Sequence, residues 1–106
     1  MVFTDSSYYI LLSLLEPRHG YGIMKYVEEL TEGEFIIGPA TLYTTIKKIQ
    51  NSGYIELDGE SEDRKKIYKL TEEGERLILS EIKRRIRMAE QGKKVLREVK
   101  GVEDYE

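Results

Sequence analysis

The stretch GPATLYTTIKKIQNSGYI, residues 38–55, decides the fold. Pro39 predicts a helix start, because proline lacks only an amide hydrogen that the first helical position does not use. Gly53 predicts the helix end, and three apolar residues between them recur at the spacing of one inward face: Leu42, Ile46 and Ile49. The stretch therefore predicts a short amphipathic helix that leads into a strand.

The opposite side of this predicted helix carries hydroxyl groups and lysines but no acid. With about 3.6 residues per turn, its central positions are Thr41, Thr44, Lys47, Lys48 and Asn51, and its flanks are Tyr43 and Thr45. Threonine lowers helix propensity by a few tenths of a kcal/mol, so three threonines in one helix indicate a surface kept for contact.

Two shorter helices are predicted before this stretch. The first begins after Thr4 or Asp5, either of which can cap free amides, and ends at Pro17; its apolar residues are Ile10, Leu11, Leu14 and Leu15. The second begins near His19-Gly20 and is closed by Gly33; its apolar residues are Ile23, Tyr26, Val27 and Leu30. His19 is expected to cap or pack at this helix start.

A β-hairpin and a long helix are predicted after it. Residues 54–58 alternate apolar and acidic side chains, which is typical of a half-buried strand; the inward residues are Ile55 and Leu57. Residues 66–70 predict the return strand, whose inward residues are Tyr68 and Leu70. Thr71 then caps a last helix from Glu72 to about Lys100, with acids in its first turn.

Three short helices followed by a hairpin are the plan of a winged helix-turn-helix, whose third helix enters the DNA major groove. The predicted fold class is mainly α with a small β-hairpin. A winged helix-turn-helix DNA-binding domain occupies residues 1–70, and a C-terminal dimerisation helix and tail occupy residues 71–106. Some winged helices bind protein instead, so a protein-protein interaction module without DNA binding is the alternative. An effector-binding or stress protein with residual DNA affinity is a third possibility.

Composition excludes several function classes. The 106 residues contain no cysteine and one histidine, so neither a disulfide scaffold nor a metal site is expected. The sequence shows no nucleophile-base pair, phosphate-binding glycine loop or paired carboxylates, so neither an enzyme nor a cofactor is expected. The first apolar run lacks a basic flank, and no run approaches the roughly 18 residues of a membrane span. A cytoplasmic protein is therefore expected.

The net charge of −3 is unevenly distributed. Acids gather in residues 28–34 and 58–63, whereas residues 64–70 carry four positive charges and no negative one. Such runs can simply be solvated faces. As DNA contacts, the candidates for phosphates are Tyr43 through its hydroxyl, Lys47, Lys48, Arg64, Lys65 and Lys66. The candidates for base edges are Thr41, Thr44, Thr45 and Asn51.

The last helix is too long for one small domain. At about 1.5 Å per residue it would measure about 43 Å, while a domain of this size has a radius of gyration of about 13 Å. Apolar residues follow the spacing of a seam that needs a partner, and resume after Gly92: Leu79, Ile82, Ile86, Ala89, Leu96 and Val99. The sequence predicts a homodimer and hence a palindromic operator, unless the stripe packs back on its own domain.

Three segments together resemble the PadR family of transcriptional regulators: HGYGIMKYV at 19–27, ATLYTTIKKIQNSGYI at 40–55 and KKIYKLTEEGERL at 65–77. The resemblance implies a homodimeric regulator, usually a repressor, with a small and often aromatic effector at the dimer interface of some members. Candidate effector contacts are Tyr8, Tyr9, Met88 and Ala89. Three features depart from the family pattern: Ala40 replaces a glycine, Thr44 replaces a frequent proline, and the wing tip at 59–63 is acidic. The tip is therefore not expected to enter a groove.

Overall fold

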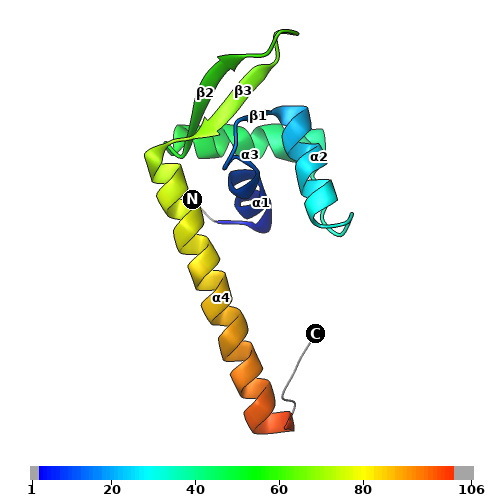
Figure 1. Cartoon of the computed structure of the whole chain (residues 1–106), viewed down its shortest axis with the longest axis vertical. Helices are drawn as coiled ribbons and strands as arrows, with labels where there is room; N and C mark the ends of the chain where they lie inside the picture. The colour runs from blue at the N-terminus through cyan, green and yellow to red at the C-terminus, as the bar shows by residue number, and fades with distance from the viewer. Residues whose placement is uncertain (1–2, 102–106) are drawn as a thin grey trace.

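A computed structural model of the chain describes residues 3–101 and contains four helices and three strands within them. In chain order the elements are α1 (Asp5–Ser13), β1 (Arg18–His19), α2 (Gly20–Leu30), α3 (Pro39–Asn51), β2 (Ile55–Glu60), β3 (Lys66–Leu70) and α4 (Glu72–Lys100). The first three helices and the sheet form a compact head, from which α4 extends (Figure 1). The radius of gyration of 16.3 Å exceeds the about 13 Å of a compact domain this size for that reason.

The short helices begin as the sequence predicts. Thr4, not Asp5, caps α1, because its Oγ1 accepts a 3.1 Å hydrogen bond from the amide of Ser7. However, α1 already ends at Ser13, so the expectation that it runs to Pro17 was wrong. Leu15 consequently lies outside the inward stripe and is 52% exposed.

The stretch at residues 38–55 also contains the predicted helix. Pro39 is the first residue of α3, and Gly53 follows the helix with a φ of 83°, a left-handed conformation that favours glycine. Thr71 caps α4 by accepting a hydrogen bond from the amide of Gly74 at 3.1 Å. The helix continues through Gly92 to Lys100, as predicted.

The sheet has one strand more than the predicted hairpin. Its antiparallel order is β1-β3-β2, with Arg18 opposite Tyr68. A two-residue strand carries no alternation that a sequence pattern could reveal. In the hairpin, Ile55 is buried, whereas Leu57 is 47% exposed although it lies opposite Tyr68, so its predicted burial was wrong. The end of the hairpin projects beyond the helices (Figure 1).

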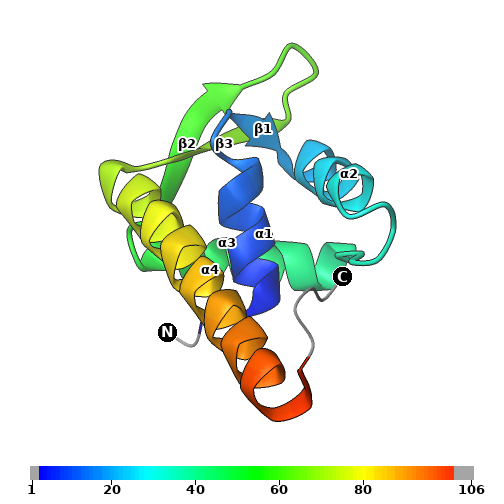
Figure 2. The ribbon, with the colours of Figure 1, turned by 60° about the horizontal axis from the view of Figure 1, so that its bottom comes forward.

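The core lies inside the head. Helix α1 contacts α2, α3 and α4, and Figure 2 shows it lying between α4 and α3. The buried apolar residues are Ile10, Leu11, Leu14, Ile23, Val27, Ile37, Leu42, Ile46, Ile49, Ile55, Tyr68 and Ile78. Ile78 is the one large apolar residue that α4 buries, and Leu77 and Ile82 pack against the core from its edge. Beyond Ile82, the described part of α4 has no fully buried side chain, and Arg85 is half-buried against Tyr8 of α1.

A close backbone contact fixes where α4 leaves the head. The Thr71 amide donates to the carbonyl oxygen of Tyr54 at 3.0 Å, and the Thr71 hydroxyl donates to the carbonyl oxygen of Gly53 at 2.6 Å. Gly74 packs against the same segment, because a Cβ there would lie 1.9 Å from the carbonyl oxygen of Tyr54. The end of α3, the start of β2 and the start of α4 are thereby joined.

We predict that Gly74→Ala lowers the free energy of unfolding by about 2–3 kcal/mol, because the new methyl group must displace backbone. Urea denaturation followed by circular dichroism measures the change. Gly22→Ala is the matched control, since its Cβ would meet the nearest atom, in the ring of His19, at an ordinary 3.5 Å. The control should be neutral or stabilising by up to about 1 kcal/mol. Equal stability of Gly74→Ala and the wild type would contradict the close packing.

Candidate nucleic-acid interface

The structure exposes the side of α3 that the sequence selects. Its apolar residues face the core, and the predicted contact residues face outward: Thr41, Tyr43, Thr44, Lys47, Lys48 and Asn51 are exposed, and Thr45 is half-buried. Ala40, Thr41, Thr44, Thr45 and Lys48 line one shallow hollow on this side. We call this exposed side of α3, from Thr41 to Asn51, the α3 surface.

The α3 surface is free of negative charge. No acidic residue lines its hollow, and within residues 3–101 neither Lys47 nor Lys48 forms an ion pair. Lysines without a carboxylate partner remain available to an external anion. A surface crowded with acids, which would favour the protein-interaction alternative, is not found around Thr41 to Lys48.

The wing keeps most of its acids near its own lysines. Lys69 on β3 pairs with two acids of β2, with Nζ 3.6 Å from a Glu56 carboxylate oxygen and 3.4 Å from one of Asp58. At the tip, the Ser61 hydroxyl donates to the Asp63 carboxylate, and Lys65 lies 3.5 Å from it. The Ser61 bond is the main cause that lowers the pKa of Asp63, with a smaller contribution from Lys65. The tip is therefore anionic at neutral pH.

Three positively charged residues at the base of the wing lie next to this acidic tip. Arg64, Lys65 and Lys66 are all exposed, and Arg64 adopts a left-handed φ of 62° in the turn. Lys65 pairs with Asp63, whereas Arg64 and Lys66 form no ion pair within the described chain. Of the three predicted phosphate contacts here, Arg64 and Lys66 are thus the freer cations.

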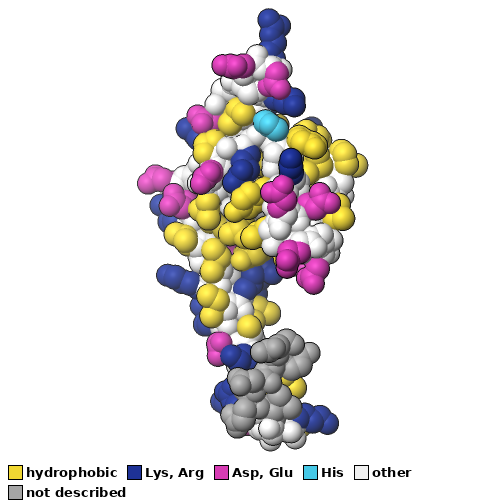
Figure 3. Space-filling view, turned by 45° about the vertical axis from the view of Figure 1, so that its right-hand side comes forward, with side chains coloured by type: hydrophobic (Ala, Val, Ile, Leu, Met, Phe, Trp, Pro, Cys, Tyr) yellow, Lys and Arg dark blue, Asp and Glu magenta, His cyan; other side chains and the backbone are white. Residues whose placement is uncertain are grey.

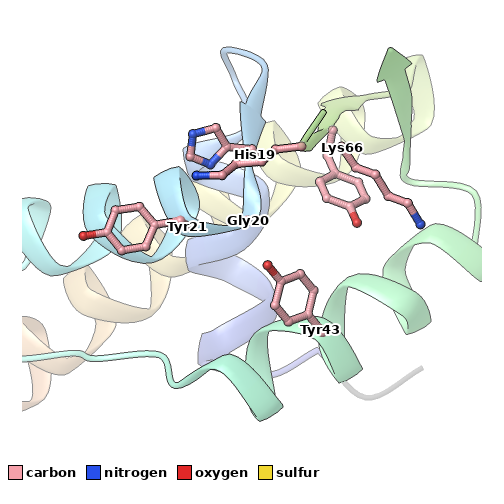
Figure 4. A pocket seen from close by; sticks show the side chains of 7 residues that line it. His19, Gly20, Tyr21, Tyr43 and Lys66 are labelled. Atoms are coloured by element: carbon pink, nitrogen blue, oxygen red, sulfur yellow. The ribbon is translucent and has the colours of Figure 1, made fainter. Parts of the chain in front are cut away.

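A cavity of about 240 Å³ opens between the start of α2, α3 and β3. Its lining joins residues far apart in the sequence: His19, Gly20, Tyr21, Tyr43, Lys65, Lys66 and Tyr68 (Figure 4). We call it the tyrosine cavity. Tyr43, Lys65 and Lys66 are predicted contact residues, whereas the other four were missed, because only the packing of α2 against α3 and β3 brings them together.

Two contacts shape the tyrosine cavity. A Cβ on Gly20 would lie 2.5 Å from the Tyr43 hydroxyl oxygen, so this close approach requires glycine. The Nδ1 atom of His19 accepts a 3.0 Å hydrogen bond from the Gly22 amide and caps α2, which confirms the predicted capping role. Burial, and to a lesser extent the neighbouring Tyr43, raises the pKa of Tyr68.

The second candidate surface runs along α4. Exposed apolar side chains continue from the head along this helix, with Lys and Arg beside them (Figure 3). Among the predicted dimer residues, Leu79, Ile86, Ala89 and Val99 are exposed and Leu96 is half-buried. Ile82 is partly buried against the core of its own chain, so only part of it is available to a partner.

The candidate effector residues already have contacts within the chain. The Arg85 guanidinium lies 4.1 Å from the ring centre of Tyr8, and the rings of Tyr9 and Phe35 are 4.7 Å apart. Met88 and Ala89 are exposed on α4. Tyr21, at the start of α2, is 59% exposed.

Neither a metal-binding cluster nor a membrane-spanning helix is present in residues 3–101. No group of three or more His, Asp or Glu side chains in this range is arranged to hold a metal ion. None of the helices described is both long and apolar enough to cross a membrane.

Comparison with known proteins points to one family. The model of the family described as transcriptional regulator PadR-like matches residues 10–80. The transcriptional regulator YqjI of Escherichia coli K12 is 34% identical over 67 residues, which cover 61% of this chain and 32% of that protein. The chain therefore spans about a third of the length of this curated relative.

Solved structures share the fold. A transcriptional regulator from Clostridium thermocellum is 28% identical with a TM-score of 0.69, covering 89% of this chain and 88% of that one. Bacillus subtilis PadR in complex with operator DNA is 24% identical with a TM-score of 0.68, covering 76% of this chain and 48% of that one. RosR of H. salinarum is 22% identical with a TM-score of 0.67, covering 90% of this chain and 91% of that one. At these identities the last two likenesses show the fold alone.

We predict that His19→Ala destabilises the protein by about 1 kcal/mol, because the first turn of α2 loses its side-chain cap. Urea denaturation checks this value. His19→Asn is the control, since asparagine is a favoured cap and should retain most of the stability. Equal losses in both variants would show that the ring of His19 contributes through packing rather than through the cap.

Proposed function

The chain belongs to the PadR-like family of transcriptional regulators, and we propose that it acts in the cytoplasm as a homodimeric repressor that binds a palindromic operator. Each α3 would enter a major groove, as the recognition helix of a winged helix-turn-helix does. The observation that carries this proposal is the α3 surface, which is exposed and free of acid in a protein of net charge −3. Bacillus subtilis PadR, which shares the fold and was solved with operator DNA, supports the same use.

The roles of the α3 surface follow from side-chain chemistry. Lys47 and Lys48, which form no ion pair within residues 3–101, are cations that suit phosphates, together with Arg64, Lys65 and Lys66 at the wing base. Thr41, Thr44, Thr45 and Asn51 carry short polar groups that suit base edges, where threonine can also place its methyl group against thymine. The regulator would thus use lysine and arginine to fix its position and the threonine positions to select sequence.

The exposed stripe on α4 supports the dimer. A helix that leaves the head with Leu79, Ile86 and Val99 about half or more exposed gains stability when a second copy covers it. Residues 1–70 would then be the DNA-binding domain, and residues 71–106 the dimerisation segment, of which 102–106 lie outside the described residues. Two α4 helices related by a two-fold axis would present two α3 surfaces to one operator.

Release by an effector would act at this interface. Tyr8 lies on α1 beside Arg85 of α4, and Met88 and Ala89 are exposed further along α4. A small aromatic molecule between two subunits would contact these side chains and change the angle between the paired heads. Such a molecule should raise the melting temperature of the dimer while lowering its affinity for operator.

We predict that Lys47→Ala combined with Lys48→Ala weakens binding to operator and random DNA alike. The slope of log K against log salt should fall by about 0.9 for each lysine that contacts a phosphate. Fluorescence anisotropy at several salt concentrations measures both quantities. Thr44→Ala is the contrasting variant: it should lose preference for operator over random DNA and keep the salt slope.

The same titrations decide between the candidate functions. Wild-type protein that binds no DNA from its own promoter region, even at low salt, would contradict the proposal. It would then favour a winged helix used for protein interaction.

We predict that Ile86→Glu prevents dimerisation, because a carboxylate would be buried in the apolar seam without a partner. The dimer dissociation constant should rise by roughly a hundredfold or more, measured by sedimentation equilibrium. Gln91→Glu, an exposed position on another side of α4, is the control and should remain dimeric. A wild type that sediments as a monomer at working concentration would refute the dimer.

A further inference from the structure

The lining of the tyrosine cavity offers donors and no carboxylate. Its side-chain polar groups are the ammonium groups of Lys65 and Lys66, the phenol groups of Tyr43 and Tyr68 and the imidazole of His19, whereas the Tyr21 hydroxyl points away (Figure 4). Ammonium groups are donors only, and a phenol donates its hydroxyl hydrogen. A cavity lined in this way favours a ligand that is anionic and rich in acceptor oxygens.

Tyr43 can lie in this cavity because Gly20, next to its hydroxyl, has no side chain. Its hydroxyl oxygen and Cζ would lie 2.5 and 2.9 Å from a Cβ on Gly20. Figure 4 shows the Tyr43 side chain rising from α3 toward Gly20 at the start of α2. The hydroxyl can therefore face a ligand in the cavity, although the Tyr43 side chain is 51% exposed.

The other neutral groups also keep donor hydrogens. Burial and the neighbouring Tyr43 raise the pKa of Tyr68, so its phenol stays protonated at neutral pH. The Nδ1 atom of His19 accepts the Gly22 amide hydrogen, so the neutral ring carries its proton on Nε2. The cavity therefore combines phenol and imidazole donors with the ammonium groups of Lys66 and of Lys65, which also pairs with Asp63.

We propose that the tyrosine cavity binds one phosphate group of the DNA backbone, beside the bases that α3 contacts. The inference rests on the proposed function and deepens it. Tyr43 belongs both to the tyrosine cavity and to the α3 surface, since it precedes Thr44 and lies one helical turn before Lys47. A phosphate held by Tyr43, Tyr68 and Lys66 would set the position of α3 along the groove. A free phosphate group has the same chemistry and is the other source to distinguish.

Tyr43→Phe tests the proposal by removing one neutral hydroxyl. Affinity for an operator duplex and for a random duplex should fall alike, by about tenfold, as expected for a lost hydrogen bond to a charged group. The salt slope should stay that of the wild type, because the phenol releases no counterion. Lys66→Ala should instead lower the slope by about 1. Fluorescence anisotropy across a salt series measures all of these values.

Two further variants separate the cavity from general damage. Gly20→Ala changes no charge but displaces the Tyr43 hydroxyl, so it should reproduce the loss of Tyr43→Phe. Tyr26→Phe makes the same chemical change as Tyr43→Phe at a ring outside the cavity lining, against which the Arg18 guanidinium lies, so its affinity should equal that of the wild type. Circular dichroism melts confirm that each variant is folded when its affinity is measured.

The outcomes are distinct. If the wild type binds DNA and both Tyr43→Phe and Gly20→Ala bind it equally well, the inference is overturned while the proposed function stands. If the wild type binds no DNA, both fail. Melting in inorganic phosphate and in chloride of equal ionic strength tests the other source. A phosphate-specific rise in the wild type that Tyr43→Phe abolishes, with unchanged DNA affinity, would assign the cavity to a free anion and overturn the DNA inference.

Discussion

The structure depends on the contact where the start of α4 meets the backbone between α3 and β2. The Thr71 amide and hydroxyl donate to the carbonyl oxygens of Tyr54 and Gly53, and Gly74 lies directly against Tyr54. Gly53 ends α3 with a left-handed φ, so the chain turns into β2 at the same point. Helix α3, the wing and α4 therefore share one junction, whose contacts are to backbone carbonyl oxygens of residues 53 and 54.

The junction matters because a regulator of this design would depend on angles. The two α3 surfaces of a dimer can occupy successive major grooves only if each α4 leaves its head in a fixed direction. Arg85 adds a second restraint further along α4, since its guanidinium lies against the Tyr8 ring and 3.3 Å from the Asp5 carboxylate on α1. Changes at the α1-α4 contact would therefore reach the spacing between the α3 surfaces without touching them.

Much of this arrangement can be predicted from the sequence, because helix ends, caps and helix faces depend on residues close together in the chain. The ends of α3 follow from Pro39 and Gly53, and the Thr71 cap and the acid-free α3 surface follow from residue order and helical periodicity. What escaped prediction depends on contacts between distant segments. The strand β1 exists only because Arg18 and His19 pair with β3, and Leu57 is exposed although the strand pattern places it on the inward face. The tyrosine cavity likewise needs the fold to bring its lining together.

The acidic net charge explains why charge placement and symmetry would both be needed. A protein of net charge −3 gains no general attraction to DNA, so affinity would have to come from cations concentrated on one side of the molecule. Lys47 and Lys48 carry no ion pair within the described chain, while Lys69 pairs with the acids of β2 and the tip carboxylate Asp63 lies beside Lys65. One such surface offers few contacts, mostly short hydroxyl groups. Two copies on one rigid frame would add their binding free energies while the entropy of association opposes binding only once, so dimerisation would turn a weak contact into a selective one.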